Sequence, residues 1–137
     1  MHKQVFGFLS IAIALVTMPG LTRSQEQVKP VFDHAIPNIK GKSMVAVVVT
    51  YHPGAKSMSH RHAGSAFIYA YVLSGSIRSK VDDQPAKVYR TGEAFYEDPG
   101  SHHVISENAS QSEPASLLAV FVVDSSERGR LTTPDAK

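Results

Sequence analysis

Histidines in the middle of the chain have the spacing of metal ligands. Of the seven histidines, His60 and His62 lie two residues apart. On an extended backbone, residues i and i+2 point to the same face, so the two imidazoles lie side by side. Two such rings can converge on one ion at the ~2.0–2.1 Å typical of metal–nitrogen bonds. Exposed histidine pairs are also common on protein surfaces, so this pair alone leaves a metal site and a solvated surface both open.

A second histidine pair follows a turn further along the chain. Gly92 begins a short β-rich stretch, Pro99-Gly100 ends it, and His102 and His103 come directly afterwards. Adjacent side chains on a strand point to opposite faces, so these two histidines cannot easily reach the same ion.

These two stretches resemble the motifs of the cupin superfamily. The first motif of that family runs glycine, five residues, H-x-H, a few residues, glutamate, six residues, glycine; Gly54, His60-Arg61-His62 and Gly75 follow it here. The second runs glycine, five residues, P-x-G, two residues, histidine, three residues, asparagine; Gly92 and His103 follow it. The resemblance extends over about residues 44–123.

The resemblance implies a fold and a metal centre. The fold would be all-β, an antiparallel double-stranded β-helix or jelly-roll barrel. One divalent metal ion would lie at the barrel mouth on His60, His62 and His103. His102 would then be a rim or surface residue, and exchanging it with His103 as ligand is the nearest alternative.

The chain departs from the family motifs at a ligand position. Counting back from Gly75 places Ile68 where the glutamate ligand is expected, and Ala66 and Phe67 beside it cannot replace a carboxylate. The resemblance therefore implies a neutral three-histidine site whose fourth ligand is not identified. Such a site suits iron, zinc, copper, nickel or manganese, leaves the ion's full charge to attract an anionic ligand, and keeps open coordination positions, as catalytic sites do.

Two smaller departures affect no ligand. Asp98 replaces the proline of the second motif, and Glu107 stands where asparagine is expected, with Asn108 one step later.

Five further residues are candidates for the pocket. Glu97, close to the Pro-Gly turn, is the candidate catalytic residue, as a general base. Tyr69, Tyr71, His52 and His102 are candidates for the pocket wall. A packed aromatic ring, a solvated acid or a surface histidine is the structural alternative for each.

Two classes of function follow from the resemblance. The first is a dioxygenase-like enzyme that acts on a small oxygen-rich or chelating substrate, or a lyase or isomerase if the metal is redox-inert. The second is a non-catalytic module that binds a small molecule or the metal itself. A barrel without a metal is a third possibility, and because fold does not imply function the reaction class rests on analogy.

Short β-rich runs separated by turn residues fill the rest of the chain. This pattern predicts an antiparallel sandwich or barrel. The predicted strands lie at residues 44–51, 67–73, 77–81, 86–89, 93–97, 103–106 and 117–123.

The first and last of these runs are apolar on both faces, which predicts that both faces are covered. The cover would come from the N-terminal arm, residues 25–41, or from a second subunit, and a homodimer is the preferred prediction. The domain core would span about 42–124, within a single domain of residues 25–137, and the polar tail 125–137 would fray or pack loosely.

Length and composition limit the remaining possibilities. The 137 residues suffice for one domain, and the chain has no cysteine for a disulfide or thiolate site. Residues 1–24 have the polar start, apolar run and small residues of a cleaved secretory signal peptide, with an uncleaved anchor or a buried helix as alternatives. Without Lys3 and Arg23, twelve of the 14 basic residues face 12 acidic residues. We therefore expect a periplasmic or secreted protein with a small-molecule partner and neither nucleic acid nor membrane as partner.

Overall fold

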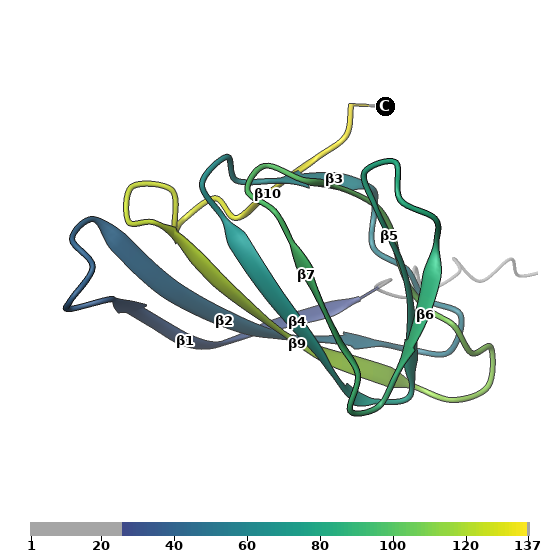
Figure 1. The fold of residues 1–137 in the computed structure, drawn as a ribbon. Coiled ribbons are helices and arrows are strands. Elements are labelled where there is room, and N and C mark those ends of the chain that lie inside the picture. Colours follow the sequence, from purple (N-terminus) through teal and green to yellow (C-terminus); the bar gives the residue numbers. More distant parts are fainter. Residues whose placement is uncertain (1–25, 137) are drawn as a thin grey trace, which may run out of the picture.

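Ten β-strands in residues 26–136 form two antiparallel sheets, as a computed structural model of the protein shows (Figure 1). The sheet here called the wall sheet has the order β1-β2-β9-β4-β7, and its strands are β1 (Gln27–Ala35), β2 (Lys42–Tyr51), β9 (Ala115–Asp124), β4 (Phe67–Ser74) and β7 (Ala94–Glu97). The other, called the site sheet, has the order β10-β3-β8-β5-β6, and its strands are β10 (Thr132–Pro134), β3 (His60–His62), β8 (His102–Asn108), β5 (Ser76–Val81) and β6 (Lys87–Arg90). This arrangement confirms the predicted all-β jelly-roll architecture.

The structure describes residues 26–136. The predicted signal peptide, residues 1–24, lies outside the described residues. Within the described part there is no helical segment with the length and hydropathy of a membrane span.

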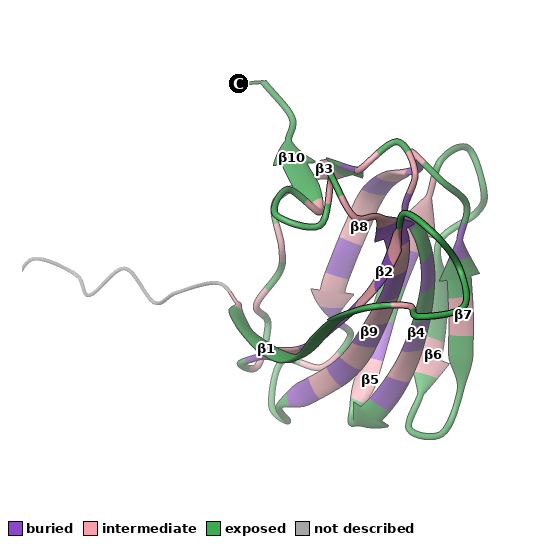
Figure 2. Ribbon diagram, turned by 90° about the vertical axis from the view of Figure 1, so that its left-hand side faces the viewer, coloured by how far each residue is buried: buried purple, intermediate pink, exposed green. Residues whose placement is uncertain are grey.

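Period-two alternation explains the central strands of the wall sheet. In β4 the side chains of Ile68, Ala70 and Val72 are buried between the sheets, whereas Phe67 and Tyr69 are exposed on the other face. β9 follows the same period, with every second residue buried along its whole length (Figure 2). Each strand therefore contributes one face to the interior and leaves the other face outside.

The turn between β4 and β5 requires glycine. Gly75 has a φ of +67°, and a Cβ there would lie 2.5 Å from the carbonyl oxygen of Pro114. The last glycine of the first motif is thus explained by a close backbone approach and a left-handed conformation.

The N-terminal arm forms an edge strand and not a cover. β1 pairs antiparallel with β2 from Gln27 opposite Thr50 to Ala35 opposite Ser43, and all its residues are exposed. Pro30 is tolerated in β1 because an edge strand has only one neighbouring strand, so its missing N–H removes no hydrogen bond to a second one. Because β1 extends the wall sheet sideways, it leaves the outer face of that sheet uncovered.

The polar tail, expected to fray or to pack loosely, does not fray between Thr132 and Pro134, because these residues form a strand that pairs with the site sheet. β10 pairs with β3, placing Thr132 opposite His62 and Pro134 opposite His60. Asp135 then fixes the end of the tail, since its Oδ2 accepts a hydrogen bond of 2.7 Å from Ser59 Oγ and lies 2.7 Å from His102 Nε2. The tail therefore pairs directly with the strand that carries two of the predicted ligands.

Candidate metal centre

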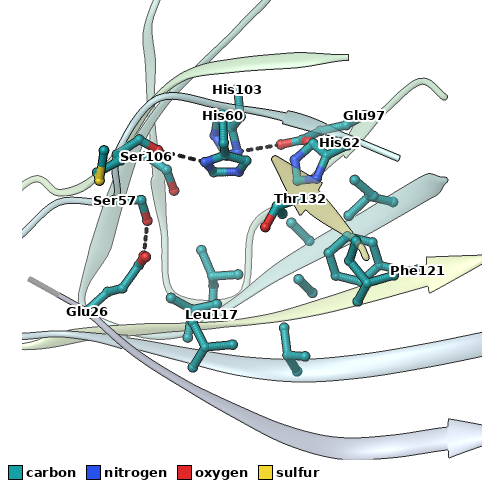
Figure 3. A pocket seen from close by; sticks show the side chains of 18 of the residues that line it. Glu26, Ser57, His60, His62, Glu97, His103, Ser106, Leu117, Phe121 and Thr132 are labelled. Carbon is teal, nitrogen blue, oxygen red and sulfur yellow. Dashed lines mark hydrogen bonds and ion pairs between the residues drawn. The ribbon is translucent and has the colours of Figure 1, made fainter. Parts of the chain in front are cut away.

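Three imidazoles from two paired strands meet in the interior. His60 and His62 lie on β3, and the pairing of β3 with β8 places His103 directly opposite His60. One ring nitrogen from each histidine lies within 4.8 Å of the other two. Figure 3 shows the three rings together at the edge of a pocket. The H-x-H spacing and one cross-strand pair are thus sufficient to build the cluster.

Hydrogen bonds to the backbone and to a serine orient two of the rings. His60 Nδ1 lies 2.7 Å from the carbonyl oxygen of Met58, which can only accept a hydrogen bond, so the proton is on Nδ1 and the Nε2 lone pair is available. His103 Nε2 lies 2.8 Å from the hydroxyl of Ser79 on β5. Such partners fix the orientation of a metal-binding imidazole.

Glu97 brings a carboxylate to the cluster. It is 2% exposed, and its carboxylate oxygens lie 2.5 Å from His62 Nε2 and 2.9 Å from His103 Nδ1. Burial raises the pKa of Glu97, but the imidazoles of His103 and His62 outweigh this and lower the pKa to about 2. The side chain is therefore an anion near neutral pH.

Glu97 lies across from the position of the missing glutamate of the first motif. β4 and β7 are paired so that Ile68 lies directly opposite Glu97. A carboxylate of the neighbouring strand thus lies beside the three histidines, while the group that could hold an ion consists of the three imidazoles. A sequence signal existed, because period two in β7 places Glu97 on the same inner face as Phe95.

The residues present fit a divalent ion. Both ring nitrogens of the buried His62 have no hydrogen-bond partner, since the contact with Glu97 lacks hydrogen-bond geometry. An unsatisfied buried polar atom costs about 1–3 kcal/mol, which a metal bond would remove. Burial also lowers the pKa of His60, favouring the neutral imidazole that a metal needs. Two nitrogens on one ion are at most about 4.2 Å apart, so small side-chain rotations would close the 4.8 Å spread.

The other candidate residues lie outside this cluster. His102 points away from it and contacts Ser59 and Asp135. Tyr69, which is 46% exposed, and Tyr71 lie on the outer face of β4, so the alternation of that strand keeps them out of the pocket. His52 is exposed in the turn after β2 and does not line the pocket either.

A bulge in β8 explains the displaced asparagine. Opposite β8, His103 pairs with Val81 and Ile105 with Lys80, so β8 has one extra residue at Val104. The buried Asn108 therefore comes one step later than in the motif. Its amide donates to the carbonyl oxygens of His52 and Glu113 at 3.1 and 2.7 Å and holds two loops together.

A cavity of about 450 Å³ opens beside the histidines. Its size is within the ~300–1,000 Å³ of small-molecule sites. Apolar side chains of the wall sheet form the wall opposite the histidines: Val47, Val49, Ile68, Ala70, Leu117, Ala119 and Phe121. Residues of β1 and of the tail, among them Val28, Pro30, Leu131 and Thr132, complete the lining.

Comparisons with known proteins agree with this architecture. The family model described as Cupin domain matches residues 47–121, which is more than half of the chain. No match was found among curated proteins.

Solved structures share the fold. An oxalate oxidase in complex with glycolate aligns with a TM-score of 0.56 and 21% identity over 73% of this chain. The protein TT1209 from Thermus thermophilus aligns with a TM-score of 0.56 and 28% identity over 72% of this chain and 83% of its own. The DMSP lyase DddQ from Ruegeria pomeroyi DSS-3 has a TM-score of 0.56 and 18% identity, over 69% of this chain and 45% of its own. The chain spans about half, 52%, of the oxalate oxidase.

Proposed function

Because the chain belongs to the cupin family, we propose that it is an exported metal-dependent enzyme acting on a small chelating substrate. One divalent ion would be held by His60, His62 and His103. The observation that carries the proposal is that these three imidazoles converge beside a cavity of about 450 Å³. Export rests on the apolar run and small residues of positions 1–24.

The residues around the histidines hold them ready for the ion. The Met58 carbonyl and the Ser79 hydroxyl orient His60 and His103. Glu97 contacts His62 and His103 and adds a negative charge that offsets part of the charge of a divalent ion. Because its carboxylate contacts two of the imidazoles, we assign Glu97 to positioning them or to ligating the ion, with the general-base role suggested by its sequence position as the alternative.

The substrate would enter a pocket that is polar on one side and apolar on the other. When bound, a redox-active ion supplies dioxygen chemistry to an enolate, diketone or catechol-like oxygen pair, and a redox-inert ion polarises a carbonyl for lyase or isomerase chemistry. The wall formed by Leu117, Ala119 and Phe121 excludes water and orients the apolar part of the substrate. An oxidase and a lyase are among the structural neighbours, but at 21% and 18% identity they support the fold alone.

Metal analysis combined with turnover tests the proposal. The protein, loaded in turn with iron, copper, manganese, nickel or zinc, would be assayed for oxygen uptake and product formation with a panel of diketones and phenols. We expect one ion per chain and turnover with at least one metal, both lost in His60→Ala. A bound ion without turnover would favour the non-catalytic binding module, and a folded protein that binds no ion would contradict any metal-dependent function.

A further inference from the structure

The cavity has a second polar end, distinct from the histidine cluster. Tyr51 on β2 is 1% exposed, and its hydroxyl lies 2.6 Å from Ser57 Oγ and 2.8 Å from Ser106 Oγ. Ser57 in turn donates to the carboxylate of Glu26. All four residues line the cavity. Figure 3 shows Glu26, Ser57 and Ser106 at one side of the pocket, with His62 at the other.

The hydrogen bond from Ser57 to Glu26 determines which group donates and which accepts in the other hydrogen bonds of this cluster. Each hydroxyl has a single proton. Since Ser57 donates its proton to Glu26, Tyr51 must donate to Ser57, and Ser106 must then donate to Tyr51. Burial raises the pKa of Tyr51 to about 12, so the phenol keeps the proton that this order requires. The three hydroxyl protons are thus all used within the cluster.

What the cluster offers to a ligand is therefore a set of acceptors. The remaining lone pairs of Ser106 and Ser57 accept hydrogen bonds, and none of the three hydroxyl protons is left to donate. A ligand group that donates, such as a hydroxyl or an ammonium, is satisfied here. A carboxylate or a ketone oxygen meets only other acceptors, which is costly in a largely buried setting.

Apolar side chains of the central strands of the wall sheet line the same cavity, among them Val47, Val49, Leu117 and Ala119. A ligand that fills the cavity therefore also needs an apolar part.

We infer that the cavity selects a ligand with a metal-coordinating group, an apolar part and a separate hydrogen-bond donor that reaches the hydroxyl cluster. Tyr51, Ser57 and Ser106 are the specificity-determining residues for the donor end. The coordinating end rests on the proposed function, whereas the donor end rests only on the hydroxyl cluster.

Alkyl hydroxamates that differ only at the far end test this inference. Zinc-loaded protein would be titrated calorimetrically with hydroxyl-, ammonium-, methyl- and carboxylate-ended hydroxamates over a series of chain lengths. At the best length, we expect the hydroxyl-ended compound to bind about tenfold tighter than the methyl-ended one, as one added hydrogen bond gives, and the carboxylate-ended compound to bind weakest. Tyr51→Phe breaks the order of protons and should abolish this ranking.

Control variants and metal-free protein keep the outcomes separate. Ser106→Ala should reduce the preference even if Tyr51→Phe does not fold, whereas Ser116→Ala, at an exposed serine pair with Ser74, should leave it unchanged. Equal binding of all end groups by the wild type would overturn the inference. If zinc does not bind, the proposed function fails, but the same ranking in the metal-free protein, at lower affinity, would still support the donor end.

A second feature, independent of the cavity, is the apolar outer face of the wall sheet. One row of cross-strand neighbours runs through all five strands: Phe32, Ala46, Val120, Tyr69 and Tyr96. The rows on either side contain Met44, Val122 and Phe67, and Val48, Leu118, Tyr71 and Ala94. Tyr96 is 63% exposed. We name these twelve residues the outer face.

The size of the outer face matches a dimer interface. Five strands about 4.8 Å apart and three rows about 7 Å apart give roughly 500 Å² per chain. Two such faces bury about 1,000 Å², the lower limit for a specific interface. None of the twelve residues is charged, and Lys42 at the border is paired with Asp124 at 2.7 Å. On the edge strand β1 the two flanking rows end at His34, opposite Met44, and at Lys29, opposite Val48, so this charge lies at the border of the outer face.

We propose that a second copy of this chain covers the outer face through a two-fold axis, as the sequence also predicted from its strands with two apolar faces. An isologous contact of this kind pairs the same patch on both subunits. Sedimentation velocity should give a dimer for the wild type and a folded monomer for Tyr69→Glu. The control Val88→Glu, at an exposed position of β6, should remain a dimer. A monomeric wild type, or dissociation by the control alone, would overturn the proposal.

Discussion

The two sheets contribute different things to the same cavity. The site sheet provides all three imidazoles, from the three-residue β3 and the bulged β8. The wall sheet provides long alternating strands whose inner side chains form much of the core. Glu97 of the wall sheet contacts two imidazoles across this division. The rings of Phe121 and Phe95, from the same sheet, pack against His62 and His103. The difference teaches that short, irregular strands can position ligands when a regular sheet opposite them supplies the stability.

The largest expected effect is the loss of metal on removing a ligand from the site sheet. In His60→Ala, the affinity for zinc should fall by more than the ~10–100-fold that loss of an outer partner costs. The fold should persist, because His60 is only partly buried at the rim of the cavity. Zinc titration and thermal unfolding of the same samples check this. If His60→Ala unfolds as well as losing the metal, the site sheet also contributes to stability, and the two sheets do not have separate roles.

The converse change belongs to the wall sheet. Leu117→Ala removes a buried side chain of β9 and should lower the free energy of unfolding by about 2–4 kcal/mol. The affinity of the folded protein for zinc should stay unchanged, since Leu117 contacts no ligand in the cluster. Urea unfolding and metal titration measure the two quantities, and a large loss of zinc affinity would contradict the assignment.

Acid should destabilise the metal-free protein in two successive pH ranges. Burial lowers the pKa of His60, so below its ordinary value of 6.5 the unfolded chain takes up a proton that the folded chain resists. Glu97, lowered from 4.5 to about 2, contributes stability that is present above pH 4.5 and is lost towards pH 2. The second contribution is on the order of 3 kcal/mol. Urea unfolding across this pH range should show that the free energy of unfolding decreases as the pH is lowered. A free energy of unfolding that stays constant below pH 4.5 would contradict the contacts of Glu97.

The contact of Glu97 with the imidazoles can be weakened without changing the shape of the Glu97 side chain. Glu97→Gln keeps the size of the side chain but removes its charge, and should lower zinc affinity about 10–100-fold. The variant at a neighbouring exposed acid, Glu93→Gln, serves as the control and should bind zinc normally. Normal zinc affinity in Glu97→Gln would mean that His62 and His103 bind the ion without the carboxylate.

The smallest effect is expected beside the site. His102→Ala removes contacts with Ser59 and Asp135 on the outside of the site sheet. We expect full zinc binding and a stability change of about 0.5 kcal/mol, typical of surface positions. A loss of zinc equal to that of His103→Ala would reverse the assignment of the two histidines.

Much of the fold was predictable from sequence because its signals are local. Short β-rich runs and the turn residues between them predicted seven of the ten strands in the described residues, β2 and β4 to β9. The resemblance to the cupin motifs implied which imidazoles meet. Each of these inferences needs only one strand or one motif.

The remainder depends on pairing between distant segments. The three residues of β10 have no periodicity, and their place is set by pairing with β3. The arm became an edge strand because β2 had a free edge, which no single stretch of sequence reveals. The role of Glu97 follows from the register that places it opposite Ile68. Tyr69 and Tyr71 lie outside the pocket because the alternation of β4 places them on the face opposite to that of Ile68 and Ala70.

X-ray absorption of the zinc-loaded protein tests the central claim most directly. The account predicts one zinc ion per chain with three imidazole nitrogens at about 2.0–2.1 Å. In His103→Ala the signal of three imidazoles should disappear. A stoichiometric ion surrounded only by oxygen, or by fewer imidazoles than three, would contradict a metal centre on His60, His62 and His103.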